Sequence, residues 1–182
     1  MTEDIKRVRL CGFGGQGVIL AGTILGYAGI KDGKMVAGSS SYGAAARGGA
    51  CRSDIVISGK TISFPHVIEV NILIAMYQRA YESYLESVDK ANGIVIYDRQ
   101  LVEPAGVKEL RQIGIPATSM AIKKLKNRQV ANIIMLGAAI ALTNLVSRES
   151  LISTIGENVK GRFKSLNLKA AELGFTLGEA EK

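Results

Sequence analysis

Residues 5–18 read IKRVRLCGFGGQGV, and this stretch decides the fold. Residues 5–11 form a candidate strand, residues 12–17 are rich in glycine, and residues 18–30 are apolar with helical spacing. A strand, a tight glycine turn and a helix in that order are typical of an α/β domain. We therefore expect a sheet whose central part is connected through helices.

The rest of the chain continues this pattern with further apolar runs of strand length. Strands are expected at residues 35–37, 51–58, 61–64, 71–76, 93–97 and 113–117, and helices at residues 77–90, 104–112, 118–126, 129–146, 148–159 and 162–173. Gly59 and Lys60 suggest a hairpin turn, so antiparallel pairs should accompany the parallel ones. The sequence predicts a single domain over residues 1–182, an α/β three-layer sandwich with a mixed, mostly parallel sheet and a helical C-terminal part.

The first candidate site is the glycine-rich loop, with the spacing G-x-G-x-x-G. Its residues are Gly12, Gly14, Gly15, Gln16 and Gly17. Glycines at this spacing let the backbone approach an anion at a helix N-terminus. A dinucleotide site also needs an acidic residue at the end of the second strand, and Asp32 precedes that strand instead. The loop is therefore either a nucleotide-type site or a turn that serves packing or a subunit interface.

The second candidate site is the small-residue run at positions 41–50, SYGAAARGGA. Its candidate binding residues are Ser41, Tyr42, Arg47, Gly48 and Gly49. A guanidinium among small residues can form paired hydrogen bonds with a carboxylate, a phosphate or the carbonyl groups of a neighbouring loop. Two interpretations stay open: Arg47 fastens the two glycine loops together, or it binds an anionic ligand or a facing subunit.

Other groups with catalytic potential are few. Cys11 and Cys51 lack metal-binding spacing and are expected to be buried thiols, and His66 is expected to be a solvated or capping residue. Asp54 and Asp98 lie in or after strands, where we favour capping roles, and Ser147 is a candidate N-cap. No catalytic residue and no metal ligand are assigned to this chain, so it is more plausibly a part of an enzyme than a whole one.

Charge and hydropathy narrow the class of partner. The net charge is +7 and the mean hydropathy is +0.19. The basic run at residues 123–128 has no exposed aromatics between its charges, so a solvated helix end or a contact with an acidic partner or phosphate is favoured over nucleic acid. No signal peptide or membrane span is recognised, which predicts a cytoplasmic protein without membrane contact.

The two loops together resemble a known family. GFGGQGV (12–18) and SYGAAARGGA (41–50), followed by RSDIVIS (52–58), ILIAM (72–76), VIYD (95–98), VANIIMLGA (130–138) and NLKAAELG (167–174), are similar to the gamma-type subunit of 2-oxoacid:ferredoxin oxidoreductases. The resemblance covers nearly the whole chain. The SYG-x-x-x-RGG form resembles the 2-oxoglutarate branch most, with pyruvate complexes behind it. Family members often carry Pro or Glu where Ala44 and Ala45 stand.

The resemblance implies a role inside a larger enzyme. Such a complex oxidatively decarboxylates a 2-oxoacid, forms an acyl-coenzyme A and passes electrons to ferredoxin. Thiamine diphosphate, Mg²⁺ and the iron–sulfur clusters would belong to alpha- and beta-type subunits and a ferredoxin-like delta-type subunit. The gamma-type chain would pack on the alpha-type subunit and help to enclose the coenzyme A or substrate channel, and its two loops would contact either coenzyme A or the facing subunit.

Two other classes of function compete with the subunit. A stand-alone nucleotide-binding regulatory module would bind nucleotide tightly without partners. An autonomous NAD-dependent oxidoreductase would need the ribose-holding acid that the loop lacks.

Overall fold

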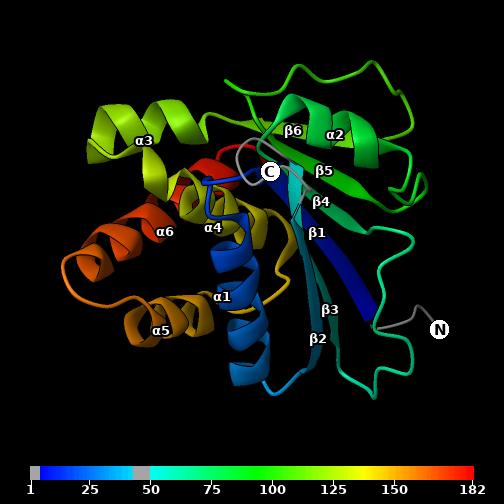
Figure 1. The fold of residues 1–182 in the computed structure, drawn as a ribbon, viewed down its shortest axis with the longest axis horizontal. Helices are drawn as coiled ribbons and strands as arrows, with labels where there is room; N and C mark the ends of the chain where they lie inside the picture. The colour runs from blue at the N-terminus through cyan, green and yellow to red at the C-terminus, as the bar shows by residue number, and fades with distance from the viewer. Residues whose placement is uncertain (1–4, 43–49) are drawn as a thin grey trace.

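A computed structural model describes residues 5–42 and 50–182, and its centre is one six-stranded sheet (Figure 1). The strands are β1 (Ile5–Phe13), β2 (Met35–Tyr42), β3 (Ala50–Ser58), β4 (Ile72–Ala75), β5 (Ile94–Asp98) and β6 (Arg111–Ile115). Their order is β2-β3-β1-β4-β5-β6. The β1–β4, β4–β5 and β5–β6 pairs are parallel, and the two pairs made by β3 are antiparallel. The predicted mixed, mostly parallel sheet is confirmed.

Helices cover the two faces of the sheet unequally. They are α1 (Val18–Lys31), α2 (Gln78–Leu85), α3 (Ala117–Leu125), the 3-10 turn η1 (Arg128–Val130), α4 (Ala131–Thr143), α5 (Arg148–Asn158) and α6 (Phe163–Glu179). Figure 1 shows α1, α4, α5 and α6 on one side of the strands, whereas α2 packs on the other face with connecting segments. All elements after β6 are helical, as the sequence predicts.

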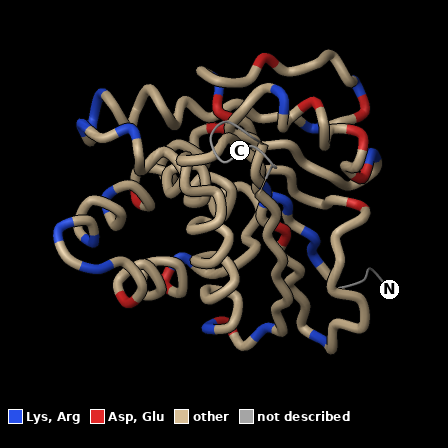
Figure 2. Tube along the Cα trace, viewed as in Figure 1, with Lys and Arg blue, Asp and Glu red and all other residues tan. Residues whose placement is uncertain are grey.

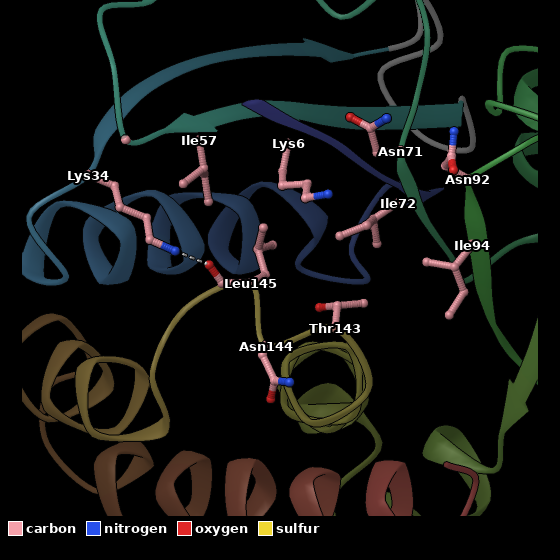
Figure 3. Close-up of a pocket in the computed structure, with 11 residues that line it drawn as sticks. Lys6, Lys34, Ile57, Asn71, Ile72, Asn92, Ile94, Thr143, Asn144 and Leu145 are labelled. Atoms are coloured by element: carbon pink, nitrogen blue, oxygen red, sulfur yellow. Dashed lines mark hydrogen bonds between the residues drawn. The ribbon is translucent and has the colours of Figure 1, made fainter. Parts of the chain in front are cut away.

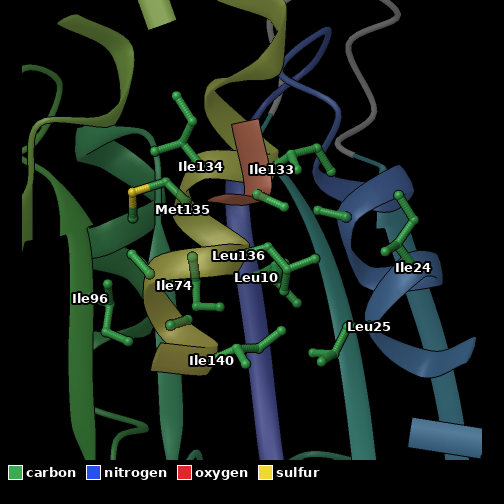
Figure 4. Packing of buried hydrophobic residues seen from close by; sticks show 14 of the residues in the cluster. Leu10, Ile24, Leu25, Ile74, Ile96, Ile133, Ile134, Met135, Leu136 and Ile140 are labelled. Atoms are coloured by element: carbon green, nitrogen blue, oxygen red, sulfur yellow. The ribbon is translucent and has the colours of Figure 1, made fainter. Parts of the chain in front are cut away.

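The main core lies between the sheet and α4, which is buried along its whole length except its end (Figure 4). Leu10, Ile74 and Ile96 project from three neighbouring strands toward Leu136 and Ile140 of α4. A helix that is apolar all round needs a cover on every side. Helix α6 supplies the outer cover, so α4 is the buried middle of the helical layer.

Two predicted elements are wrong. Residues 61–64 form no strand, because both edges of β3 are already paired, with β1 on one side and β2 on the other. The hairpin is therefore β2–β3, and residues 59–70 instead cross toward β4. Residues 104–110 form no helix, since Pro104 and Gly106 interrupt the segment before β6 begins at Arg111.

The predicted capping residues have mixed outcomes. Ser147 caps α5, because its hydroxyl accepts a hydrogen bond from the Ser150 N–H at 3.1 Å. Asp98 caps α3, because it accepts hydrogen bonds from the N–H and hydroxyl of Thr118 at 2.9 and 2.6 Å. Asp54 is not a cap.

Asp54 is instead the buried partner of Arg9. The Arg9 Nε and Nη2 atoms donate to its two carboxylate oxygens at 2.7 and 2.8 Å. Arg9 also donates to the Val67 carbonyl and lies over the Tyr84 ring. Because Arg9 stands opposite Asp54 in the β1–β3 pairing, the ion pair joins two strands under the α2 layer. A strand pattern alone does not reveal such a pair.

Within the described residues, no helix is both long and apolar enough to cross a bilayer.

Candidate functional site

The candidate site lies at the carboxyl edge of the parallel strands, where the chain changes direction. After β1 the chain enters α1 on one face of the sheet, and after the neighbouring β4 it enters α2 on the opposite face. Connections that leave adjacent strands in opposite directions open a crevice between them, and α/β proteins bind ligands in such crevices. The glycine-rich loop borders this crevice.

Gln16 holds the loop in shape. Its side-chain oxygen accepts a hydrogen bond from the Phe13 N–H at 2.6 Å, and its side-chain nitrogen donates to the Met76 carbonyl at 2.8 Å. The loop after β1 is thereby tied to the end of β4. The sequence prediction of a shaped loop is consistent with this bracing, but its choice of Gln16 as a binding residue remains untested.

The loop glycines have different reasons to be glycine. A Cβ on Gly12 would lie 2.6 Å from the Gln16 side-chain oxygen, and one on Gly17, where φ is +73°, would collide with the Asn132 amide. Gly15 also has a positive φ of +97°, but a Cβ there would meet no atom within 4 Å. Gly14 has neither constraint, since its φ is ordinary and the space beside it is open. The fold itself therefore requires Gly12 and Gly17 but gives no reason for Gly14.

The loop leads into the N-terminus of α1 without a side-chain cap. Gly17 occupies the N-cap position in the left-handed conformation, and its carbonyl accepts a hydrogen bond from the Asn132 side chain at 2.9 Å. The first backbone N–H groups of a helix have no partner within the helix and carry partial positive charge. This end of α1 thus favours an electron-rich group.

A cavity of about 640 Å³ opens beside the loop. Five separate segments of the chain form its wall; they include Phe13, Gly14, Gly15, Gln16, Tyr77, Gln100, Thr118, Arg128 and Gln129. A second cavity of about 360 Å³ adjoins it and shares Gly15 and Gln129 with the first. Both volumes lie in the range of small-molecule sites. Gly15 borders both cavities, and Gly14 borders the larger one.

The surroundings of these cavities are positively charged. Arg128 lines the larger cavity and Lys160 lines the smaller one. Every charged residue between Glu109 and Glu149 is basic. Figure 2 shows Lys and Arg positions along the chain gathered at the end of α3 and around the turn between α5 and α6. The arrangement favours a ligand or a partner surface with negative charge.

The second predicted loop is described only in part. Ser41 and Tyr42 end β2 and are exposed, Tyr42 to 72%. They stand opposite Arg52 and Cys51 of β3, whose other edge pairs with the end of β1. Ser41 and Tyr42 thus lie at the same edge of the sheet as the glycine-rich loop, with β3 between them. Arg47, Gly48 and Gly49 lie outside the described residues, so their predicted contacts stay predictions.

This sheet order also argues against a dinucleotide fold. In that fold the strand beside β1 is parallel and ends with the ribose-binding acid. Here the neighbour on that side is the antiparallel β3, with β2 beyond it. Asp32 lies at the far end of α1, where it accepts hydrogen bonds from the N–H and hydroxyl of Ser147. Burial opposes its charge, but the hydrogen bonds from Ser147 and Ser150 keep the pKa of Asp32 below its ordinary value.

The predicted inert groups lie away from reactive surroundings. Burial raises the pKa of the Cys11 thiol despite the nearby Arg9, and burial also raises that of Cys51. A thiol with a raised pKa is a poor nucleophile and a poor metal ligand. His66 is exposed and packs edge-on against Phe64. Among the described residues, no group of three or more His, Cys, Asp or Glu could hold a metal ion.

Several wall residues were missed from the sequence. Gln100, Thr118 and Gln129 come from the ends of β5, the start of α3 and the turn before α4. Gln100 and Thr118 had a positional signal, because residues that follow parallel strands gather at one sheet edge. Gln129 lies after α3 and had no such signal. Arg128 was recognised only as part of a basic run, without its place in a cavity wall.

Comparison with known proteins places the chain in a family. The model of the family "Pyruvate ferredoxin/flavodoxin oxidoreductase" matches residues 7–177. The chain belongs to this family. The resemblance read from its motifs is thereby confirmed at the family level.

Individual relatives match over nearly the full length. The "2-oxoglutarate synthase subunit KorC" of Methanocaldococcus jannaschii is 42% identical over 96% of this chain and 94% of that protein. The gamma subunit of a keto/oxoacid ferredoxin oxidoreductase from Geobacter sulfurreducens has a TM-score of 0.83 and 34% identity, covering 96% of this chain and 99% of that one. Both matches extend over nearly the whole of each relative.

A larger protein contains the same fold as one part of its chain. The 2-oxoglutarate:ferredoxin oxidoreductase of Magnetococcus marinus, solved with 2-oxoglutarate, coenzyme A and succinyl-CoA, has a TM-score of 0.90 at 22% identity. The match covers 99% of this chain but 32% of that one. At this identity the likeness concerns the fold alone.

Proposed function

We propose that this chain is the gamma subunit of a 2-oxoacid:ferredoxin oxidoreductase that acts on 2-oxoglutarate in the cytoplasm. The observation that carries the proposal is the full-length match, at 42% identity, to a subunit of 2-oxoglutarate synthase. The described residues agree with an accessory role, because Arg128 is the one charged residue in the described wall of the cavity beside the glycine-rich loop, and the buried Thr118 hydroxyl is engaged by Asp98 at the start of α3. The alternative is that the chain belongs to a complex that acts on pyruvate.

The iron–sulfur clusters of such a complex do not fit the two cysteines of this chain. An iron–sulfur cluster needs about four cysteine ligands, whereas the sequence has two cysteines. Cys11 and Cys51 belong to the cores on opposite faces of the sheet. We therefore assign thiamine diphosphate, Mg²⁺ and the clusters to alpha-, beta- and delta-type partner subunits, with ferredoxin as the acceptor of the electrons.

The contribution of this chain is to bind and position coenzyme A against a partner subunit. Coenzyme A carries several phosphate groups, and three features near the loop favour them. The N-terminus of α1 presents backbone N–H groups that have no partner within the helix, Arg128 lines the larger cavity, and Lys160 lines the smaller one. Gly14 and Gly15 leave open backbone beside the cavities, against which a ligand or a partner chain can lie closely. Ser41, Tyr42, Arg47, Gly48 and Gly49 would complete this contact from the neighbouring strand end.

Purification of the chain with its natural partners tests the proposal. A tagged full-length chain, recovered under anaerobic conditions from its native source, should bring down larger subunits with the absorption of iron–sulfur clusters. The recovered material should reduce a viologen dye with 2-oxoglutarate and coenzyme A, and more slowly with pyruvate. Faster reduction with pyruvate would transfer the chain to the pyruvate class. Recovery of the chain alone, with tight nucleotide binding by calorimetry, would replace the proposal by a regulatory module.

A further inference from the structure

A third cavity lies at the opposite edge of the sheet from the glycine-rich loop. Its volume is about 290 Å³, and it opens between the amino ends of the parallel strands and the C-terminal end of α4 (Figure 3). Its apolar floor is formed by Ile57, Ile72 and Ile94. This edge is distant from the crevice to which the coenzyme A proposal refers, so the two sites are independent.

Lys6 is an unexpected residue at this position. Side chains alternate across a strand, so Lys6 projects to the same face of β1 as Val8 and Leu10, which are buried against the helical layer. In the β1–β3 pairing Lys6 stands opposite Ile57. A charged side chain therefore occupies the core-facing row of a central strand. Figure 3 shows its amine reaching into the space above Ile72.

Lys34 brings a second ammonium group to the same cavity. It follows α1 and donates a hydrogen bond to the Leu145 carbonyl at 2.8 Å. That contact offsets the partial negative charge at the end of α4. The Lys6 ammonium, in contrast, has no acceptor among the residues that the structure describes. One cation is thus engaged and the other is available to a ligand.

Three of the remaining polar side chains of the wall are amides, and the fourth is the Thr143 hydroxyl, which donates to the Ala139 carbonyl. Asn71 uses its side-chain oxygen to accept a hydrogen bond from the Arg7 N–H at 2.9 Å, which leaves its NH₂ group as a donor. Asn92 and Asn144 line the same cavity, Asn144 from the left-handed residue that ends α4. None of the described residues that line it is acidic. Two cations with amide donors over an apolar floor form a surrounding that favours a negative charge.

We propose that this cavity binds a small organic or inorganic anion that carries a carboxylate or phosphate group. The acidic oxygens would contact the Lys6 ammonium and the neighbouring amides, and a short carbon chain would lie on the isoleucine floor. The volume is at the lower limit of small-molecule sites, which excludes a ligand of nucleotide size. A bound anion would join the sheet to the loop after α4 and so stabilise the folded chain.

Titration of the ¹⁵N-labelled full-length chain, followed by amide NMR shifts, tests the proposal. The probes are inorganic phosphate and succinate, each at constant ionic strength. We expect saturable shifts at Lys6, Asn71 and Asn144 with at least one probe, and the probe that binds more tightly identifies the acidic group. The variant Lys6→Gln should weaken binding about tenfold, because it removes a charged hydrogen-bond donor. The matched variant Lys124→Gln, on exposed α3, should leave the affinity unchanged.

Three results would overturn the site. They are an absence of saturable shifts with both probes at millimolar concentration, equal weakening by the two variants, and shifts confined to residues 123–128. If Lys6→Gln gives a disordered spectrum, Lys34→Gln serves as the second variant. It must then weaken the binding of the same probe, and unchanged affinity in that variant would also overturn the site.

Discussion

Glycines in two regions of the molecule have opposite surroundings. Between α4 and α6, a Cβ on Gly174 would collide with the Ile134 carbonyl, and one on Gly137 would lie 2.6 Å from the Ala171 carbonyl. These glycines let the two helix backbones approach closely. In the loop after β1, a Cβ added to Gly14 or Gly15 would meet no atom within 4 Å. The same residue type therefore serves internal packing in one region and leaves open surface in the other.

The comparison separates what the fold needs from what a partner or ligand needs. Where a Cβ would collide with other atoms of the chain, packing explains why the residue is glycine. Where the space is open and φ is ordinary, nothing within the chain explains it. The expected cost of an added Cβ falls from Gly174, where it meets backbone atoms, through Gly17, where it meets a side chain at a positive φ. It falls further at Gly15, which has a positive φ alone, and is least at Gly14, which has neither constraint. If the proposed function is right, the effect of substitution on stability should fall in that order, while the effect on assembly should be greatest at the open positions.

The largest loss of stability is expected for Gly174→Ala. The added methyl group meets backbone atoms of α4, which cannot rotate away, so the helices must separate. The free energy of unfolding should fall by about 3 kcal/mol, measured by urea denaturation. Gly156→Ala is the matched control, because its Cβ would meet only the flexible end of Lys164 at 3.6 Å. That variant should be slightly stabilised, and equal losses in both would contradict the packing argument.

Gly17→Ala should have the next largest effect. It forces a non-glycine residue into a left-handed conformation and pushes against the Asn132 amide. We expect the free energy of unfolding to fall by about 2 kcal/mol. Gly33→Ala isolates the backbone part, since Gly33 has a φ of +71° and no close neighbour. If Gly17→Ala lowers the free energy of unfolding no more than Gly33→Ala does, the Asn132 side chain moves aside without an energetic cost.

Gly15→Ala should cost about 1 kcal/mol in stability, the cost of a positive φ alone. Its open surroundings add no steric term. Thermal unfolding of the isolated chain measures this cost. The same variant should recover less of the larger subunits in the anaerobic purification. Full recovery with the expected stability loss would leave Gly15 as a turn residue only.

Gly14→Ala should change the stability least, by less than about 0.5 kcal/mol. If the loop lies against coenzyme A or a partner, the methyl group should raise the KM for coenzyme A roughly tenfold or reduce assembly. Steady-state kinetics of the purified complex distinguishes the two effects. A complex with wild-type assembly and kinetics would remove this loop from the site, and a strongly destabilised chain would break the comparison itself.

Local patterns predicted much of the fold. The strand, loop and helix at residues 5–30 were found because apolar periodicity and clustered glycine are properties of neighbouring residues. The hairpin was misplaced because strand pairing is not local: Gly59 and Lys60 look like a turn, yet β3 already has β1 and β2 beside it. The second half of β2 was missed because GSSSY has no apolar alternation in an exposed strand.

The sequence predicted only those residues of the candidate site that are contiguous along the chain. The glycine-rich loop is contiguous and was identified, whereas Gln100, Thr118 and Gln129 come from separate segments that meet only in the folded sheet. Lys6 was likewise hidden, because a basic residue among IKRVRL carries no sign that its row faces the helices. Such residues become informative only when the topology is known.

The Arg9–Asp54 ion pair also has a consequence for how the strands find their alignment. A slip of β3 by one residue along β1 would set Arg9 beside Ser53 or Ile55 and separate the two charges. Removing one partner of a buried ion pair costs about 3–5 kcal/mol, so misaligned pairings are strongly disfavoured. The ion pair therefore selects one register for the antiparallel half of the sheet. That register also fixes where the end of β2 lies along the strand direction relative to the glycine-rich loop.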